Sequence, residues 1–145
     1  MVRIRDEIRE IASDAGLQVR ELHPAEIVRI RGRLLERFDS GRSGSALWQR
    51  IESGEGFQDR EAWRLIDQIL DTTVPIVFFD IEREVAMFEL FDGTDLVQLL
   101  GEMRNEEFYV TDIDAEFIIC HNRYDFLIAC GSAIAWLDRI LRPPE

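Results

Sequence analysis

The spacing of apolar residues changes near residue 71, and this change constrains the fold more than any other feature of the sequence. Before that point apolar residues recur at helical spacing, which predicts helices at 2–15, 24–38, 46–51 and 59–70. From residue 74 onward they follow the alternating pattern that is typical of strands. The 145 residues have the size of one ordinary domain. We therefore predict a single domain, 1–145, that is mainly helical over 1–70 and sheet-forming over 71–145.

The sheet-forming part contains five predicted strands, at 74–81, 84–91, 107–112, 116–120 and 126–130. The first two are expected to form a hairpin that turns at Glu82-Arg83. This turn places Val77 opposite Phe88 and Ile76 opposite Glu89. One face of the hairpin is then wholly apolar and belongs to the core, whereas the other face mixes apolar side chains with carboxylates.

Helices complete the predicted fold. Thr94 is expected to cap a helix over 95–103, between the second and third strands, and a last helix covers 133–141. Residues 53–57 are predicted as a loop. The fold class is α+β: a mostly antiparallel sheet of about five strands, flanked by N-terminal helices, one inter-strand helix and a C-terminal helix.

The charge of the chain is acidic and unevenly distributed. The net charge is −12, and the range 71–145 holds 16 of the 29 Asp and Glu residues but only 5 of the 17 basic residues. Such an excess repels phosphate and disfavours direct binding to nucleic acid. A basic protein partner and solubility alone are the two interpretations that this charge leaves open.

Composition also predicts a cytoplasmic protein that does not enter a membrane. No apolar stretch reaches the length of a membrane span, and the N-terminus is charged where a signal peptide needs an apolar block. The two cysteines, Cys120 and Cys130, are too few for a disulfide scaffold and are expected to be reduced core residues. Adjacent strand residues point to opposite faces, so Cys120 and His121 are not expected to ligate one metal ion.

Sequence motifs give no support for catalysis. The chain has no phosphate-binding loop, no glycine pattern for dinucleotides, no zinc-protease helix motif and no nucleophile elbow. We predict no catalytic residue, no metal and no cofactor. An enzymatic role stays open, and the sequence disfavours it.

A family resemblance is carried by residues 107–131, EFYVTDIDAEFIICHNRYDFLIACG, with the preceding VPIVFFDIEREVAMFELFDGTDLVQLL and the upstream Ala46-Leu47-Trp48. These segments resemble a family of small uncharacterised bacterial α+β proteins. The resemblance implies a histidine pair where this chain has Arg123-Tyr124, which favours binding over catalysis. As a class, small acidic α+β proteins are also similar to the immunity proteins that neutralise bacterial toxins.

The first functional prediction is a non-catalytic cytoplasmic binding protein, an immunity-like or antitoxin-like inhibitor of a basic protein. The mixed face of the hairpin would supply apolar anchors ringed by acids. The predicted partner-binding residues are Ile76, Phe78, Asp80, Glu82, Met87, Glu89, Phe91 and, from another segment, Trp48. The competing expectation is that an N-terminal helix covers this face as a second core layer.

The second prediction is a ligand-binding domain or small enzyme with a site near the turn at 122–125. His121, Asn122 and Asp125 are polar residues framed by apolar strands, and a pocket that converges on them would favour this alternative. Ordinary turn chemistry also accounts for Asn122 and Asp125. A third alternative is a regulatory or self-associating domain, which includes a homodimer.

Overall fold

Seven strands form one antiparallel sheet in the order β1-β4-β3-β5-β6-β7-β2. The computed structural model describes residues 3–41, 44, 46–51, 55–70, 73–103 and 107–142. The strands are β1 (Val19–Glu21), β2 (Glu55–Gln58), β3 (Ile76–Phe78), β4 (Phe88–Leu90), β5 (Phe108–Thr111), β6 (Phe117–His121) and β7 (Phe126–Gly131). The helices are α1 (Ile4–Ala15), α2 (Pro24–Phe38), α3 (Leu47–Arg50), the 3-10 helix η1 (Ala62–Leu65), α4 (Ile66–Leu70), α5 (Gly93–Glu102) and α6 (Ala133–Leu141).

The α+β class is confirmed, but the predicted number of strands is wrong. The structure has seven strands where about five were predicted, because β1 and β2 lie in the half of the chain expected to be helical. Both are short edge strands, and β2 occupies most of the predicted loop at 53–57. Gly56 of β2 lies close to the backbone of β7, where a Cβ atom would meet the Leu127 carbonyl. In a sequence pattern such a glycine indicates a loop, although here it is needed because two strands approach closely.

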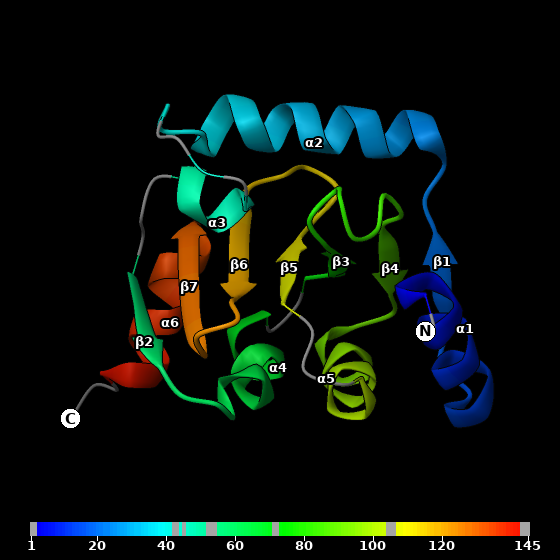
Figure 1. Cartoon of the computed structure of the whole chain (residues 1–145). Helices are drawn as coiled ribbons and strands as arrows, with labels where there is room; N and C mark the ends of the chain where they lie inside the picture. The colour runs from blue at the N-terminus through cyan, green and yellow to red at the C-terminus, as the bar shows by residue number, and fades with distance from the viewer. Residues whose placement is uncertain are drawn as a thin grey trace.

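Helices cover both faces of the sheet. On one face, α2 and α3 pack over the side chains of one core cluster; on the other, α1, α4, α5 and α6 pack over a second cluster. Figure 1 shows α2 crossing the sheet from the β1 edge toward β7, with α4 and α5 on the opposite side. Since both faces are covered, the strands β3, β5 and β6 are buried along their whole length.

The predicted register of the first hairpin is confirmed over a shorter length. Val77 pairs with Phe88 and Ile76 pairs with Glu89, as the alternating pattern indicated. Each strand has only three residues, and residues 79–87 form a long connection in place of the predicted two-residue turn. The predicted register is correct because the register of a strand pair is decided by which side chains of each strand face the core.

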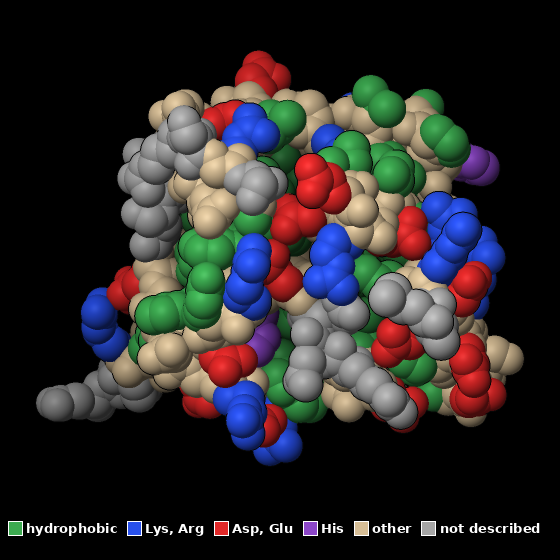
Figure 2. Space-filling view, in the orientation of Figure 1, with side chains coloured by type: hydrophobic (Ala, Val, Ile, Leu, Met, Phe, Trp, Pro, Cys, Tyr) green, Lys and Arg blue, Asp and Glu red, His purple; other side chains and the backbone are tan. Residues whose placement is uncertain are grey.

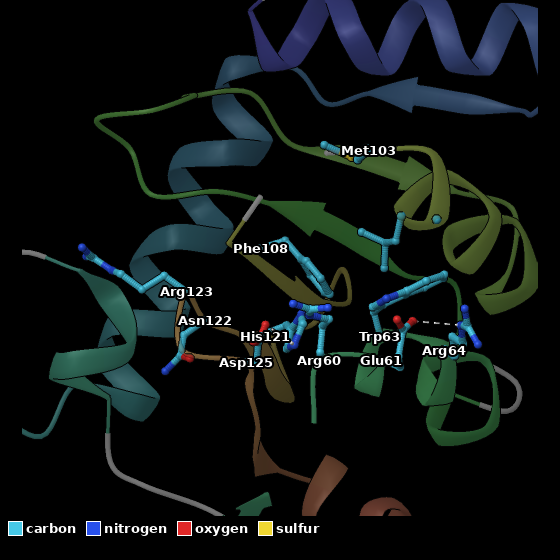
Figure 3. Close-up of a pocket in the computed structure, with 12 residues that line it drawn as sticks. Arg60, Glu61, Trp63, Arg64, Met103, Phe108, His121, Asn122, Arg123 and Asp125 are labelled. Carbon is cyan, nitrogen blue, oxygen red and sulfur yellow. Dashed lines mark ion pairs between the residues drawn. The ribbon is translucent and has the colours of Figure 1, made fainter. Parts of the chain in front are cut away.

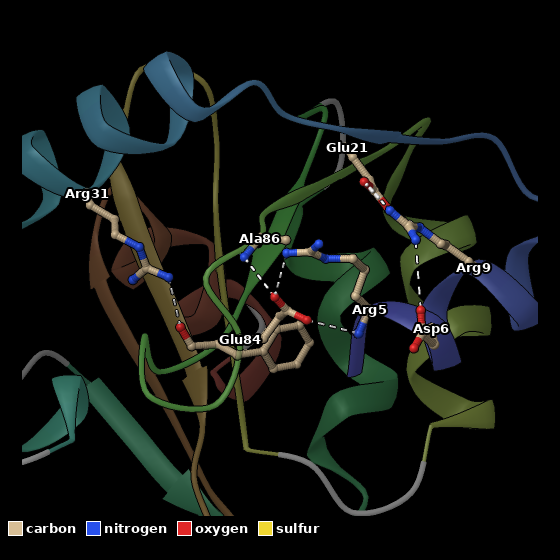
Figure 4. A network of polar contacts seen from close by, with 8 residues as sticks. Arg5, Asp6, Arg9, Glu21, Arg31, Glu84 and Ala86 are labelled. Carbon is tan, nitrogen blue, oxygen red and sulfur yellow. Dashed lines mark hydrogen bonds and ion pairs between the residues drawn. The ribbon is translucent and has the colours of Figure 1, made fainter. Parts of the chain in front are cut away.

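Polar contacts from both helical layers anchor this connection (Figure 4). Glu84 is almost fully buried and accepts hydrogen bonds from the backbone N–H of Arg5 (3.1 Å), the Arg5 guanidinium (3.2 Å) and the N–H of Ala86 (3.1 Å). From the other layer, the Arg31 guanidinium donates to the carbonyl of Phe79 (3.2 Å). These contacts explain why the chain leaves the ladder after Phe78.

The N-cap of α5 is Asp92, and the predicted cap at Thr94 is wrong. The carboxylate of Asp92 accepts a hydrogen bond from the N–H of Asp95 (2.9 Å), while Thr94 is already inside the helix.

We expect Asp92→Ala to lower the free energy of unfolding by about 1 kcal/mol, because the backbone N–H of Asp95 loses its hydrogen-bond acceptor. Thr94→Ala is the matched control and should change it by less than about 0.5 kcal/mol. Urea titrations of both variants measure the difference, and equal losses would contradict Asp92 as the cap.

Candidate functional site

The apolar centre of the predicted partner surface is not on the surface. Ile76, Phe78 and Met87 have no exposed area and pack beneath α2, against side chains such as Leu34. The competing expectation of a second core layer is therefore correct for these three residues. Their alternation identified a buried face, but the sequence did not show which helix would cover it.

The acidic residues predicted around that centre do not form one ring. Glu89 pairs with Arg20 (3.2 Å), and Asp80 accepts hydrogen bonds from the N–H of Leu47 (3.0 Å) and the Tyr109 hydroxyl (3.3 Å). Glu82 is exposed. Neutralising the three acids together would therefore break structural contacts as well as change the charge. An inhibitor of a basic protein stays a prediction, supported by the net charge alone.

The remaining predicted partner residues lie apart from one another. Phe91 is 65% exposed at the end of β4. Trp48 lies in α3, where its backbone N–H donates to the Tyr109 hydroxyl (3.1 Å) and its ring contacts the Tyr124 ring edge-on. Trp48 therefore supports the turn after β6 and does not extend the predicted hairpin surface.

A cleft of about 530 Å³ opens at the end of β6, beside η1, the end of α5 and the start of β5. Figure 2 shows this face of the molecule, where a histidine side chain lies in a recess among basic and acidic side chains. The cleft is lined by Arg60, Glu61, Trp63, Arg64, Leu100, Gly101, Met103, Phe108, His121, Asn122, Arg123 and Asp125. Its volume is in the range of sites for small molecules.

The three residues of the second prediction, His121, Asn122 and Asp125, converge on this cleft. Asn122 builds the turn: its side-chain oxygen accepts hydrogen bonds from the N–H groups of Tyr124 (2.9 Å) and Phe126 (3.1 Å). Asp125 has a left-handed backbone with φ of 64°, which Asp tolerates better than most residues. The hydrogen bonds and backbone conformation of an ordinary turn are thus present as well, and they position Asp125 and His121 at the cleft.

His121 is the buried titratable group of the cleft. It is 8% exposed, and its ring lies 5.7 Å from that of Phe108. Its Nε2 atom is buried and has no hydrogen-bond partner among the described residues, while the Asp125 carboxylate lies 3.9 Å away. Burial lowers the pKa of His121, against smaller opposing effects of the Asp59 backbone and the Asp125 charge. The imidazole is therefore neutral at pH 7.

Three arginines line the cleft, and the sequence reasoning missed two of them, Arg60 and Arg64. Arg64 pairs with Glu61 (3.1 Å) and lies over the Trp63 ring. Arg123 extends away from the other lining side chains, whereas Arg60 extends toward Phe108 and His121 (Figure 3). Within the described part of the chain, Arg60 has no ion pair with an acidic side chain. Arg123 also has no ion pair in those residues, but it extends away from the cleft, so Arg60 is the cation placed to meet a ligand.

Pairing between β2 and β7 brings Arg60 to the cleft. The register joins Gln58 to Phe126, and the N–H of Asp59 then donates to the carbonyl of Asp125 (2.8 Å). The arginine after Asp59 is thereby placed beside a turn that lies far along the chain.

The model of DUF6756, a family of unknown function, matches residues 1–140. The chain belongs to DUF6756. Membership of an uncharacterised family was predicted and is confirmed, whereas bacterial origin and likeness to immunity proteins stay predictions. No curated protein and no solved structure matches this DUF6756 chain.

Cys120 and Cys130 of the DUF6756 chain are buried in the core beneath α2, as predicted. They share one face of the sheet, and His121 faces the other side, toward the cleft. Burial raises the pKa of Cys120 far above its usual value, so the thiol is unreactive at neutral pH.

The described ranges contain neither a metal site nor a helix that could span a membrane. Within them, no group of three or more His, Cys, Asp or Glu side chains is arranged to hold a metal ion. None of the helices in the same residues is both long and apolar enough to cross a bilayer.

Glu107, which lies beside Asp80, supports the backbone of the cleft turn. Glu107 accepts a hydrogen bond from the N–H of Arg123 (3.1 Å). Burial raises the pKa of Glu107, and the neighbouring Asp80 carboxylate raises it further. Because this pKa is higher in the folded state, the contribution of Glu107 to stability is present at acidic pH. It is lost as the pH rises through the folded-state pKa.

We therefore expect Glu107→Gln to stabilise the DUF6756 chain at pH 7. The amide keeps an oxygen that accepts from Arg123 and removes the unfavourable charge. The gain should be about 1 kcal/mol or less, since the group is partly exposed, and should vanish near pH 4. Urea titrations at the two pH values measure it, with Glu116→Gln at an exposed site as the control. A loss of stability at pH 7 would contradict the raised pKa.

Proposed function

We propose that this DUF6756 protein is a ligand-binding domain whose cleft holds a small organic anion. The observation that carries the proposal is that Arg60, which has no acidic partner among the described residues, lies in a cleft with a buried, unpartnered atom of His121. Arg139 also lacks an ion pair in those residues, but it lies outside the cleft.

The cleft provides the contacts that an organic anion needs. Guanidinium groups donate charge-assisted hydrogen bonds to carboxylate or phosphate in a fixed planar geometry, which Arg60 can supply. The ion pair between Arg64 and Glu61 neutralises one of the two carboxylates that line the cleft, so this acid does not repel the ligand strongly. Trp63, partly buried between Arg64 and the α5 backbone at Gly101, adds an aromatic wall.

Thermal denaturation with a panel of small anions tests the proposal. Inorganic phosphate, succinate and glutarate are added at constant ionic strength, because a ligand that binds only the folded state raises the melting temperature. At least one should stabilise the protein, and Arg60→Gln should weaken its binding by about tenfold or more.

The control variant is Arg139→Gln, which removes an exposed arginine of α6 outside the cleft. It should bind the stabilising anion as the wild type does. The proposal is wrong if no anion stabilises the protein, or if both substitutions weaken binding equally through the net charge.

A further inference from the structure

We propose that the ligand is zwitterionic, an α-amino acid or a compound with the same head group, because the cleft presents an unpaired cation and an unpaired anion together. This inference rests on the proposed function and specifies its ligand class. The cation is Arg60 and the anion is Asp125, which line the same cavity. Two opposite charges in one small site are both satisfied by a molecule that carries a carboxylate and an ammonium group.

Asp125 is available to a ligand as much as Arg60 is. Its side chain is 47% exposed, and within the described residues the ionisable group that lies within 4 Å of its carboxylate is His121, which is neutral. The backbone of Asp125 is held by the turn, since its N–H donates to the Asn122 carbonyl (3.0 Å) and its carbonyl accepts from Asp59 (2.8 Å). The carboxylate is therefore fixed at the cleft without a cationic partner. A ligand that is only anionic would leave it unpaired and would be repelled by it.

His121 supplies a second acceptor for an ammonium group. Its Nε2 atom has no hydrogen-bond partner among the described residues, and a neutral imidazole accepts a hydrogen bond at one of its two nitrogens. With the proton on Nδ1, Nε2 is an acceptor. It lies 3.9 Å from Asp125 Oδ1, a separation at which one nitrogen can lie within hydrogen-bond distance of both atoms. An ammonium group has three donors and can serve both acceptors, whereas a hydroxyl has one.

Asp125 and His121 therefore define the ammonium end of the ligand, and Arg60 defines the carboxylate end. Nε2 is buried whereas the Asp125 side chain is half-exposed, so the carboxylate is the more accessible of the two acceptors. The apolar lining side chains Leu100, Met103 and Phe108 are almost fully buried. The accessible wall is thus mainly polar, which fits recognition of a charged head group.

Calorimetry with matched probes tests this assignment. L-leucine, L-phenylalanine and L-glutamate are each compared with the analogue that lacks the amino group: 4-methylpentanoate, 3-phenylpropanoate and glutarate. At least one amino acid should bind about tenfold or more tightly than its analogue, as expected for a charged hydrogen-bonded contact. Equal binding of every pair would overturn the zwitterion and leave the anion site intact.

Variants locate the ammonium contact. Asp125→Asn keeps a residue that tolerates the left-handed backbone. It should remove the preference for the amino acid, by weakening its binding and by raising the affinity of the analogue that the carboxylate no longer repels. Asp114→Asn, at an exposed turn outside the cleft, is the matched control and should keep the preference. The inference is also wrong if Asp125→Asn keeps the preference. If neither amino acids nor the small-anion panel binds, the proposed function fails together with it.

Discussion

Replacing Phe88 by alanine is expected to lower the free energy of unfolding by about 3 to 5 kcal/mol, among the largest effects of any single truncation in this chain. Phe88 has no exposed area and lies in β4, hydrogen-bonded on one side to β1 and on the other to β3. Its ring belongs to the core that α1 and α5 cover. Truncation removes the transfer free energy of the ring and leaves a cavity that the flanking strands cannot close.

Phe91 provides the control for this experiment. It belongs to the same segment and is the same residue type, but its side chain is 65% exposed, so Phe91→Ala should cost less than about 0.5 kcal/mol. Urea titrations with a common slope compare the two variants. A loss below about 1 kcal/mol for Phe88→Ala would contradict the register that pairs it with Val77.

The parts of the fold that the sequence predicts are those fixed by local periodicity. The helix 24–38 is observed with the same bounds, because Ile27, Ile30 and Leu34 form a stripe that has to face the sheet. Gly16 ends α1 in a left-handed conformation directly after the last helical residue, the place where glycine is the usual cap. Such features need information from only a few neighbouring residues.

The sequence pattern does not show which strands pair over long distances in the chain. β1 pairs with β4 and β2 pairs with β7, and in both cases the partner lies far along the chain. These two strands therefore form without the local alternation of apolar residues by which strands are predicted. The predicted helix at 59–70 is also divided into a turn, η1 and α4. The apolar spacing of this segment indicated buried side chains, but it did not show which type of backbone structure carries them.

The candidate site follows the same division. His121, Asn122 and Asp125 are neighbours in sequence, and their grouping was predicted. Arg60 lies beside them only because β2 pairs with β7 at the edge of the sheet. Since β2 was predicted as a loop, the sequence did not place Arg60 at the cleft.

The predicted partner surface differs for another reason. Its apolar residues were identified correctly as one face of the hairpin, but α2 covers that face.

Gly131→Ala is expected to cost about 3 kcal/mol, because two separate penalties act at this position. Gly131 ends β7 with φ of 69°, a conformation that costs an L-residue about 1 to 2 kcal/mol. A Cβ atom there would also collide with the carbonyl oxygen of Glu116 and come within 2.9 Å of the Phe38 ring. The carbonyl belongs to the neighbouring backbone and cannot rotate away, so β6, β7 and α2 would have to separate.

Gly16→Ala distinguishes the two penalties. Gly16 has nearly the same backbone angle, with φ of 70°, but no atom within 4 Å of the added Cβ. It should therefore show the conformational cost alone, about 1 kcal/mol, and the difference between the variants measures the close approach of β7 to its neighbours. Equal losses for the two substitutions would mean that α2 and the start of β6 are not packed against Gly131. The contact of α2 with this end of the sheet would then be weaker than the structure shows.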